Sequence, residues 1–100
     1  MNDFIEKSVI RIFKSCKKQR TYSSYYNHRN GYTYYESTLG YFRVTAWCNM
    51  SKEICVEVFL LNKLIYEAKV QKEEELEDAL LEARQIILDI CNKSTSVLES

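Results

Sequence analysis

The chain has 100 residues, of which 46% are hydrophobic and 28% are charged, and its formal net charge is zero. This length and composition predict one globular domain and exclude a disordered chain. No apolar stretch approaches the roughly 20 residues that span a bilayer, and residues 1–10 lack the apolar run of a signal peptide. We therefore expect a cytoplasmic domain over residues 1–93, followed by a polar tail at 94–100, with no membrane contact.

The two halves of the chain carry opposite charges. Residues 1–50 hold eight Lys/Arg and three acidic residues, a net charge of +5, whereas residues 51–100 hold six and eleven, a net charge of −5. Such asymmetry is typical of a protein that meets an anionic partner on one face, associates head to tail, or binds a partner that reads both signs. Two solvated faces of opposite charge are the alternative. The four cysteines lack metal-binding spacing, and we expect buried free thiols.

The first predicted element is a helix over about residues 3–19, with Asn2 and Asp3 as candidate N-caps. Apolar residues recur in it at helical spacing and would form one buried stripe. Basic residues spaced by four, three and four form a ridge on the same helix: Lys7, Arg11, Lys14 and Lys18. A basic ridge is usually a solvated face, and its alternative role is to contact an anion.

The stretch 20–43 holds seven of the eight tyrosines, the only histidine and both glycines. Within it Asn30-Gly31 is a strong turn signal between two segments rich in strand-forming residues. We therefore predict a hairpin with arms near 22–27 and 32–38. A tyrosine-rich loop is the alternative, because the alternation of the two arms is imperfect.

Alternation of apolar and polar residues predicts three further strands, at 41–48, 54–61 and 64–70. Opposed residues of an antiparallel pair share one face, so the turn lengths must keep carboxylates out of the core. A five-residue turn after the first strand sets Val44 against Val58, whereas a four-residue turn would set it against Glu57. A three-residue second turn sets Val58 against Tyr66, whereas a two-residue turn would set it against Glu67. The longer turns are therefore predicted.

The last predicted element is a helix from about Lys72 to Asn92, whose apolar residues step by three or four. Glutamates crowd its first turns, where the helix dipole favours negative charge. Acidic residues along this helix could compete for a nucleic-acid-binding groove of a partner, by placing carboxylates where phosphates would lie. The candidates are Glu74, Glu75, Glu77, Asp78, Glu82 and Asp89.

This order of elements predicts a two-layer α+β domain. An antiparallel sheet of three to five strands, the meander plus the tyrosine-rich hairpin, would have both helices packed on one face. On its second face the register gathers a mostly apolar cluster: Tyr41, Arg43, Thr45, Trp47, Phe59 and Ile65. Because such a face is too apolar to leave in water, the hairpin, a second copy or a partner must cover it.

The second half of the chain contains VEVFLLNKLIYEAKVQKEEELEDALLEARQIIL, Val56–Leu88, with a Val-Glu-Val strand, an Asn-Lys turn, a return strand and an alanine-containing helix. Over roughly residues 54–90 this pattern resembles the second half of the double-stranded-RNA-binding domain. The resemblance implies that family's order of helix, three strands and helix. The family contacts phosphates through lysines that start the last helix, whereas only Lys72 is basic there and glutamates follow it. The resemblance therefore implies the fold and not that RNA-binding mode.

No enzyme is predicted, and no catalytic residue, metal ligand or cofactor. The only histidine, His28, lies in a predicted turn without an identifiable partner, and phosphate-loop and nucleophile motifs are absent. We expect a non-enzymatic module that binds a protein stoichiometrically, with a homodimer through the aromatic surface as one form. Its candidate contacts are Tyr25, Tyr26, Tyr34, Tyr35, Tyr41, Trp47, Phe59, Ile65, Glu74, Glu75, Asp78 and Glu82.

Two further expectations concern the partner. In its small size, lack of proline, many tyrosines and polarised charge, the chain resembles phage or mobile-element inhibitors of host nucleic-acid machines, such as anti-CRISPR proteins, which act in the host cytoplasm. The alternative is a nucleic-acid-binding protein, in which tyrosines stack on bases and basic side chains contact phosphates. Its candidate contacts are Lys7, Arg11, Lys14, Lys18, Arg20, Arg29 and Arg43.

Overall fold

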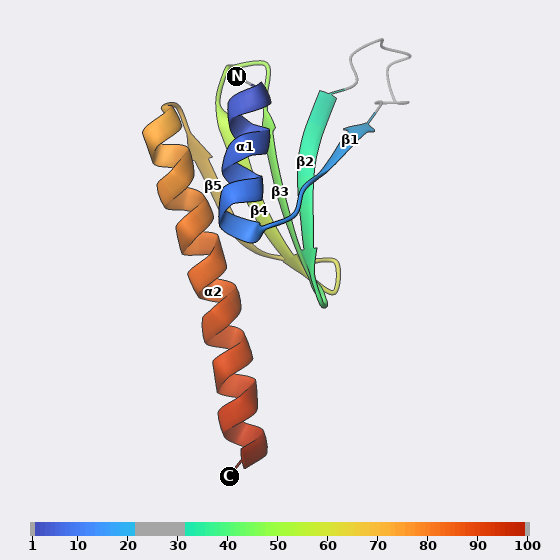
Figure 1. The fold of residues 1–100 in the computed structure, drawn as a ribbon, viewed down its shortest axis with the longest axis vertical. Helices are drawn as coiled ribbons and strands as arrows, with labels where there is room; N and C mark the ends of the chain where they lie inside the picture. The colour runs from blue at the N-terminus through green and yellow to red at the C-terminus, as the bar shows by residue number, and fades with distance from the viewer. Residues whose placement is uncertain (1, 22–31, 100) are drawn as a thin grey trace.

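The computed structural model describes residues 2–21 and 32–99, which form a two-layer α+β fold (Figure 1). The elements are α1 (Asn2–Phe13), β1 (Lys17–Thr21), β2 (Tyr32–Leu39), β3 (Phe42–Cys48), β4 (Ile54–Leu60), β5 (Lys63–Val70) and α2 (Glu73–Glu99). The antiparallel strands pair in chain order, with α1 packed over β2 and β3 and α2 over β4 and β5. The predicted fold class, with both helices on one face, is confirmed.

Helix α1 is shorter than the predicted helix over 3–19. It ends at Phe13 because Lys14 adopts a left-handed backbone with φ of 66°. The Lys14 N–H donates to the Ile10 carbonyl over 2.8 Å, which is the single bond of an αL cap. Glycine usually occupies this position, so the sequence does not signal the stop. The prediction of one basic ridge is therefore wrong, since Lys18 lies in β1.

The second arm of the predicted hairpin is confirmed as β2. It opposes β1, with Thr21 against Tyr32, on one side and β3 on the other. Strands β1 and β2 therefore extend the sheet within its plane. The arm predicted at 22–27 and the Asn30-Gly31 turn lie outside the described residues.

The register between β3 and β4 is the predicted one, with Val44 opposite Val58 and residues 49–53 forming the turn. Asn49 holds this turn together. Its Oδ1 accepts hydrogen bonds from the backbone N–H groups of Ser51 and Glu53, at 3.0 and 2.9 Å. An Asn side chain that bonds the following backbone in this way stabilises a turn without a proline or glycine.

Between β4 and β5 the register is as predicted but the turn is not. Tyr66 opposes Val58, yet the turn has two residues, Leu61 and Asn62, instead of the predicted three. A β-bulge resolves the difference, because Leu64 opposes Phe59 and one extra residue of β5 lies before Tyr66. The assumption of a regular ladder was therefore the error in the turn prediction.

Helix α2 extends to Glu99, beyond its predicted end near Asn92, so residues 94–99 of the predicted polar tail continue the helix. It begins with half of a capping box, in which the Glu75 carboxylate accepts a hydrogen bond from the Lys72 N–H at 3.2 Å. Its apolar stripe is buried as predicted: Leu76, Ala79, Leu80, Ala83 and Ile87.

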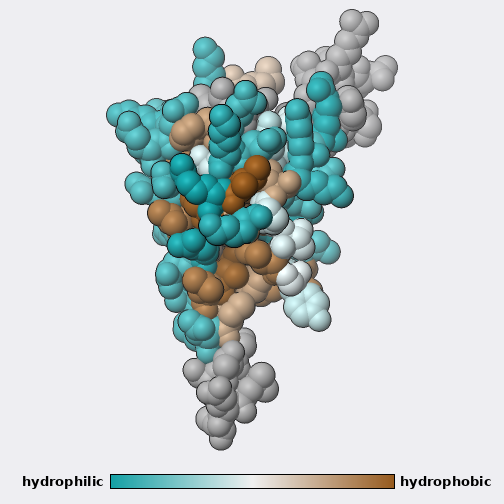
Figure 2. Space-filling model, viewed as in Figure 1, coloured by the Kyte–Doolittle hydropathy of each residue, from teal (hydrophilic) through white to brown (hydrophobic). Residues whose placement is uncertain are grey.

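The core lies between the helices and one face of the sheet. Burial of its aliphatic side chains stabilises the domain by about 1.5–3 kcal/mol each. Ser15 and Ser37 share a hydrogen bond of 2.9 Å at the edge of this core. Hydrophilic residues cover most of the helix-bearing side, and apolar residues reach the surface below the end of α1 (Figure 2). No helix in residues 2–21 and 32–99 is long and apolar enough to cross a membrane.

Candidate functional site

The sheet face that points away from the helices, the open face, carries no helix from the described residues. The register arranges its side chains in three rows across the strands. The rows are Gln19, Tyr34, Trp47, Cys55 and Lys69, then Lys17, Glu36, Thr45, Glu57 and Glu67, then Thr38, Arg43, Phe59 and Leu64. The aromatic residues of this face therefore lie in the first and third rows, and the middle row is mostly charged.

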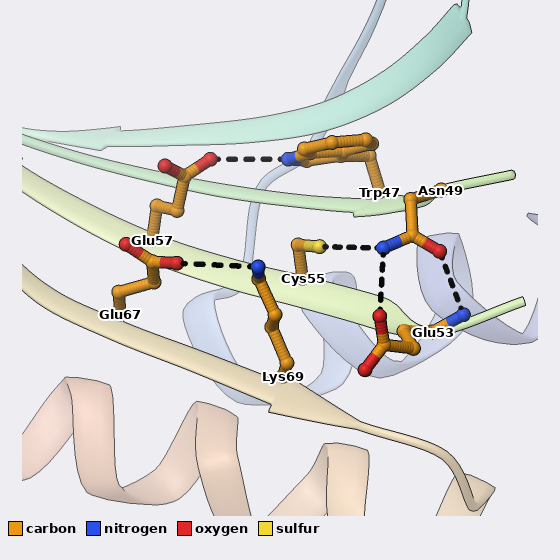
Figure 3. A network of polar contacts seen from close by, with 7 residues as sticks. All are labelled: Trp47, Asn49, Glu53, Cys55, Glu57, Glu67 and Lys69. Atoms are coloured by element: carbon orange, nitrogen blue, oxygen red, sulfur yellow. Dashed lines mark hydrogen bonds and ion pairs between the residues drawn. The ribbon is translucent and has the colours of Figure 1, made fainter. Parts of the chain in front are cut away.

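The middle of the open face is polar and internally bonded. Trp47 donates its indole N–H to Glu57 Oε1 over 3.0 Å, and the Lys69 ammonium lies 4.0 Å from Glu67 (Figure 3). Thr45, which lies between Glu36 and Glu57 in the register, is only 7% exposed. Because its polar groups bond one another, this part of the face is compatible with water.

Cys55 is the most buried residue of the open face, at 2% exposure. The Asn49 amide lies 3.7 Å from its sulfur and also donates to Glu53 Oε1 at 3.2 Å (Figure 3). Burial is the main reason that the pKa of the Cys55 thiol is raised, although the nearby Lys69 opposes the shift. A thiol with a raised pKa stays protonated at neutral pH, which makes Cys55 a packing residue and a poor nucleophile.

Apolar side chains gather at one end of the open face. The apolar turn cluster consists of Tyr41, Phe59, Leu61 and Leu64, together with Arg43, which lies over Phe59. Tyr41 is 77% exposed, Leu61 68% and Leu64 43%. The two turns that carry Tyr41 and Leu61 are joined by a hydrogen bond of 3.2 Å from the Leu61 N–H to the Tyr41 carbonyl. Arg43 lies over the Phe59 ring, 4.6 Å from its centroid, a cation–π distance.

Sequence reasoning located only part of this cluster. It placed Tyr41 in a strand, whereas Tyr41 follows Gly40 in a two-residue turn, where the φ of +60° at Gly40 is typical of a type II′ hairpin. It also assigned Ile65 to the open face, but the bulge turns Ile65 toward the core. Leu64, opposite Phe59, takes that place instead. The bulge had no sequence signal, because neither glycine nor proline marks it.

A second candidate surface is an open groove of about 230 Å³ between β5 and α2. Its lining residues are Tyr66, Ala68 and Val70 of β5 and Glu75, Asp78, Ala79 and Glu82 of α2. Three of the six acidic candidates on α2, namely Glu75, Asp78 and Glu82, therefore come together along it. They meet because α2 folds back along β5 after a connection of only two residues, Gln71 and Lys72.

One hydrogen bond joins the two sides of this acidic groove. Tyr66 donates its hydroxyl hydrogen to Glu82 Oε2 over 3.1 Å. Burial, this hydrogen bond and the Glu82 charge raise the pKa of Tyr66 to about 12. Tyr66 therefore remains a neutral donor that holds the Glu82 carboxylate at the rim.

The other predicted aromatic contacts are not on a described surface. Tyr35 is buried in the core at 2% exposure, because its position in β2 points it toward α1. Burial also raises the pKa of its hydroxyl, with smaller effects of Glu6 and Asp3. Tyr25 and Tyr26 lie outside the described residues.

The predicted basic contacts do not form one surface among the described residues. Lys7 and Arg11 lie on α1, where Arg11 pairs with Glu77 of α2 at 3.1 Å. Strand β1 carries Lys18 and Arg20, and Arg29 lies outside the described residues. Arg43 lies instead on the open face, 4.0 Å from the Glu36 carboxylate. These cations are thus spread over three elements.

In residues 2–21 and 32–99, no group of three or more His, Cys, Asp and Glu side chains is arranged to hold a metal ion. The four cysteines are free thiols, and Cys91 is exposed, contrary to the expected burial. Comparison of the chain with protein-family models, curated proteins and solved structures found no match.

Proposed function

We propose that this protein is a non-enzymatic module that binds another protein stoichiometrically through the apolar turn cluster. Leu61 carries the proposal. It is 68% exposed and adopts a left-handed backbone with φ of 50°. A branched residue in that conformation costs about 1–2 kcal/mol, and an exposed leucine regains little of it by burial. Backbone strain without a packing benefit is typical of a functional position.

The neighbours of Leu61 suit a protein interface. Tyr41 and Arg43 belong to the residue types that dominate interface hot spots, because they combine a large contact area with polar groups. The contact of Arg43 with the Phe59 ring holds both side chains in place before a partner arrives, which lowers the entropy lost on binding.

Nucleic-acid binding is less well supported by this geometry. Three carboxylates, Glu36, Glu57 and Glu67, form part of the middle row of the open face and would repel phosphates. That the partner is a host nucleic-acid machine, and the protein a phage inhibitor, stays a prediction that the identity of a captured partner decides.

The substitution Leu61→Asn separates binding from folding. Asparagine tolerates the left-handed conformation better than leucine, so the variant should be more stable by up to about 1 kcal/mol. It should nevertheless lose the partner captured by immobilised wild-type protein. Leu81→Gln is the matched control, since Leu81 is an exposed leucine of α2 on the other side of the sheet.

Two results would contradict the proposal. One is capture that survives Leu61→Asn undiminished. The other is binding of RNA or DNA, single-stranded or duplex, that weakens steeply with salt, because such binding reports phosphate contacts. If light scattering shows that the wild-type protein is a dimer and that Leu61→Asn is a monomer, the partner is a second copy of the chain.

A further inference from the structure

We infer that the groove between β5 and α2 binds an extended, basic segment of a partner protein, which adds to the sheet as a sixth strand beside β5. This inference uses a different surface from the apolar turn cluster and does not depend on it. It rests on the unpaired edge of β5, the apolar floor of the groove and the charge of its rim.

Strand β5 is an edge strand. Among the described strands it pairs only with β4, so its outer edge offers backbone N–H and C=O groups to another strand. The bulge protects the first half of β5, because a bulge opposes edge pairing. The second half, Tyr66–Val70, is regular and borders the groove. A strand added there would complete the hydrogen bonding of this half.

The opposite edge of the sheet is better protected. Strand β1 has five residues, and three of them, Lys17, Lys18 and Arg20, are cationic. Short length and lysines are the usual means by which an edge strand avoids a partner. The contrast makes the second half of β5 the edge that is open to strand addition.

The residues of the floor and rim of the groove indicate which kind of segment would bind there. Ala68, Val70 and Ala79 form an apolar floor, and Glu75, Asp78 and Glu82 line the α2 side. Asp78 and Glu82 are about 6 Å apart along the helix axis, close to the roughly 6.7 Å between alternate residues of a strand. Lysine or arginine at alternate positions of an added strand would therefore follow the α2 carboxylates one after another.

Charge excludes a second copy as the favoured occupant. Pairing of β5 with its own symmetry mate would bring the acidic rims of two α2 helices together. Residues 51–100, which include both elements, already carry six Lys/Arg against eleven acidic residues. Like charges placed opposite each other weaken association, whereas a basic segment neutralises the rim.

The test uses the full chain and short synthetic peptides. The probe alternates lysine with threonine and valine (KTKVKTK), and calorimetry and amide NMR shifts report binding. Two control peptides match it in length: ETEVETE reverses the charge, and KPKPKPK lacks three backbone N–H donors and favours a polyproline II helix over a strand. We expect KTKVKTK to bind, to shift the Tyr66–Val70 amides most, and to exceed both controls.

Variants locate the site. Asp78→Lys should weaken KTKVKTK binding about tenfold, because a contacting carboxylate becomes a cation. Glu74→Lys makes the same charge change on α2 at an exposed residue that does not line the groove, and should weaken binding much less. Circular dichroism verifies that both variants fold.

Three outcomes would overturn the inference. The first is no binding of KTKVKTK at low salt, and the second is equal binding of KPKPKPK, which excludes strand addition. The third is a wild-type dimer in light scattering that Asp78→Lys abolishes, which would assign the groove to a second copy. The proposed function is tested separately, because it concerns another surface. If Leu61→Asn loses the captured partner, the proposed function is supported even when the peptide tests of the groove fail.

Discussion

Replacing Lys14 by glycine should stabilise the protein, although glycine is the least favourable ordinary residue in a helix. Lys14 is exposed and has a φ of 66°. A left-handed backbone costs a residue with a side chain about 1–2 kcal/mol, whereas glycine adopts it freely. Glycine also gives the unfolded chain more freedom, which offsets about 0.4–1 kcal/mol of the gain. The net effect of Lys14→Gly is therefore a stabilisation of about 0.8 kcal/mol, midway between limits of about 0 and 1.6 kcal/mol.

The matched control is Lys7→Gly. Lys7 is another exposed lysine, but it lies within α1, where glycine costs about 0.5–1 kcal/mol. The same chemical change should thus shift the thermal midpoint in opposite directions, by about 4–8 °C for each kcal/mol. Circular dichroism during heating measures both shifts. If Lys14→Gly lowers the midpoint as Lys7→Gly does, the helix continues past Phe13 in solution and the assignment of β1 is wrong.

Two further predictions concern the core and the acidic groove. Leu80 is fully buried, so Leu80→Ala should lower the free energy of unfolding, measured by urea denaturation, by about 2–5 kcal/mol. Leu81 is 39% exposed, so Leu81→Ala should lower it much less. Equal losses would contradict the packing of α2. Because its pKa is raised to about 12, Tyr66 holds its proton more tightly in the folded protein than in the unfolded chain. Its contribution to stability is complete below pH about 10 and is lost as the pH rises through about 12. Tyr66→Phe should therefore flatten the alkaline loss of stability and remove one late-titrating tyrosine from the ultraviolet absorbance titration. An unchanged titration would refute the raised pKa of Tyr66.

The strand register shows how far a local pattern can carry a prediction. Setting Val44 against Val58 and Val58 against Tyr66 required only that the carboxylates of Glu57 and Glu67 stay out of the core, and both pairings are present. The physical basis is strict, because a slip of one residue inverts every side chain of a strand. The composition of α2 was equally informative, since its apolar stripe has a single helical period.

Prediction failed where residues other than glycine adopt a left-handed backbone conformation, because the sequence gives no signal for it. Lys14 ends α1 and Leu61 begins a two-residue turn, both with positive φ, although neither is glycine. Each departure had a consequence for the candidate site. The first divided the predicted basic ridge between α1 and β1, and the second, with the bulge, replaced Ile65 by Leu64 on the open face.

The sequence by itself determined the α+β class, the buried stripes and the pairing of the central strands, because these follow from the periodicity of apolar residues. It also determined that acidic residues crowd α2. Only the tertiary structure decided which of those side chains meet. The return of α2 along β5 brings Glu75, Asp78 and Glu82 beside a strand edge that is unpaired among the described strands. Contacts between residues far apart in the chain depend on turns and bulges whose small energies leave no periodic signal.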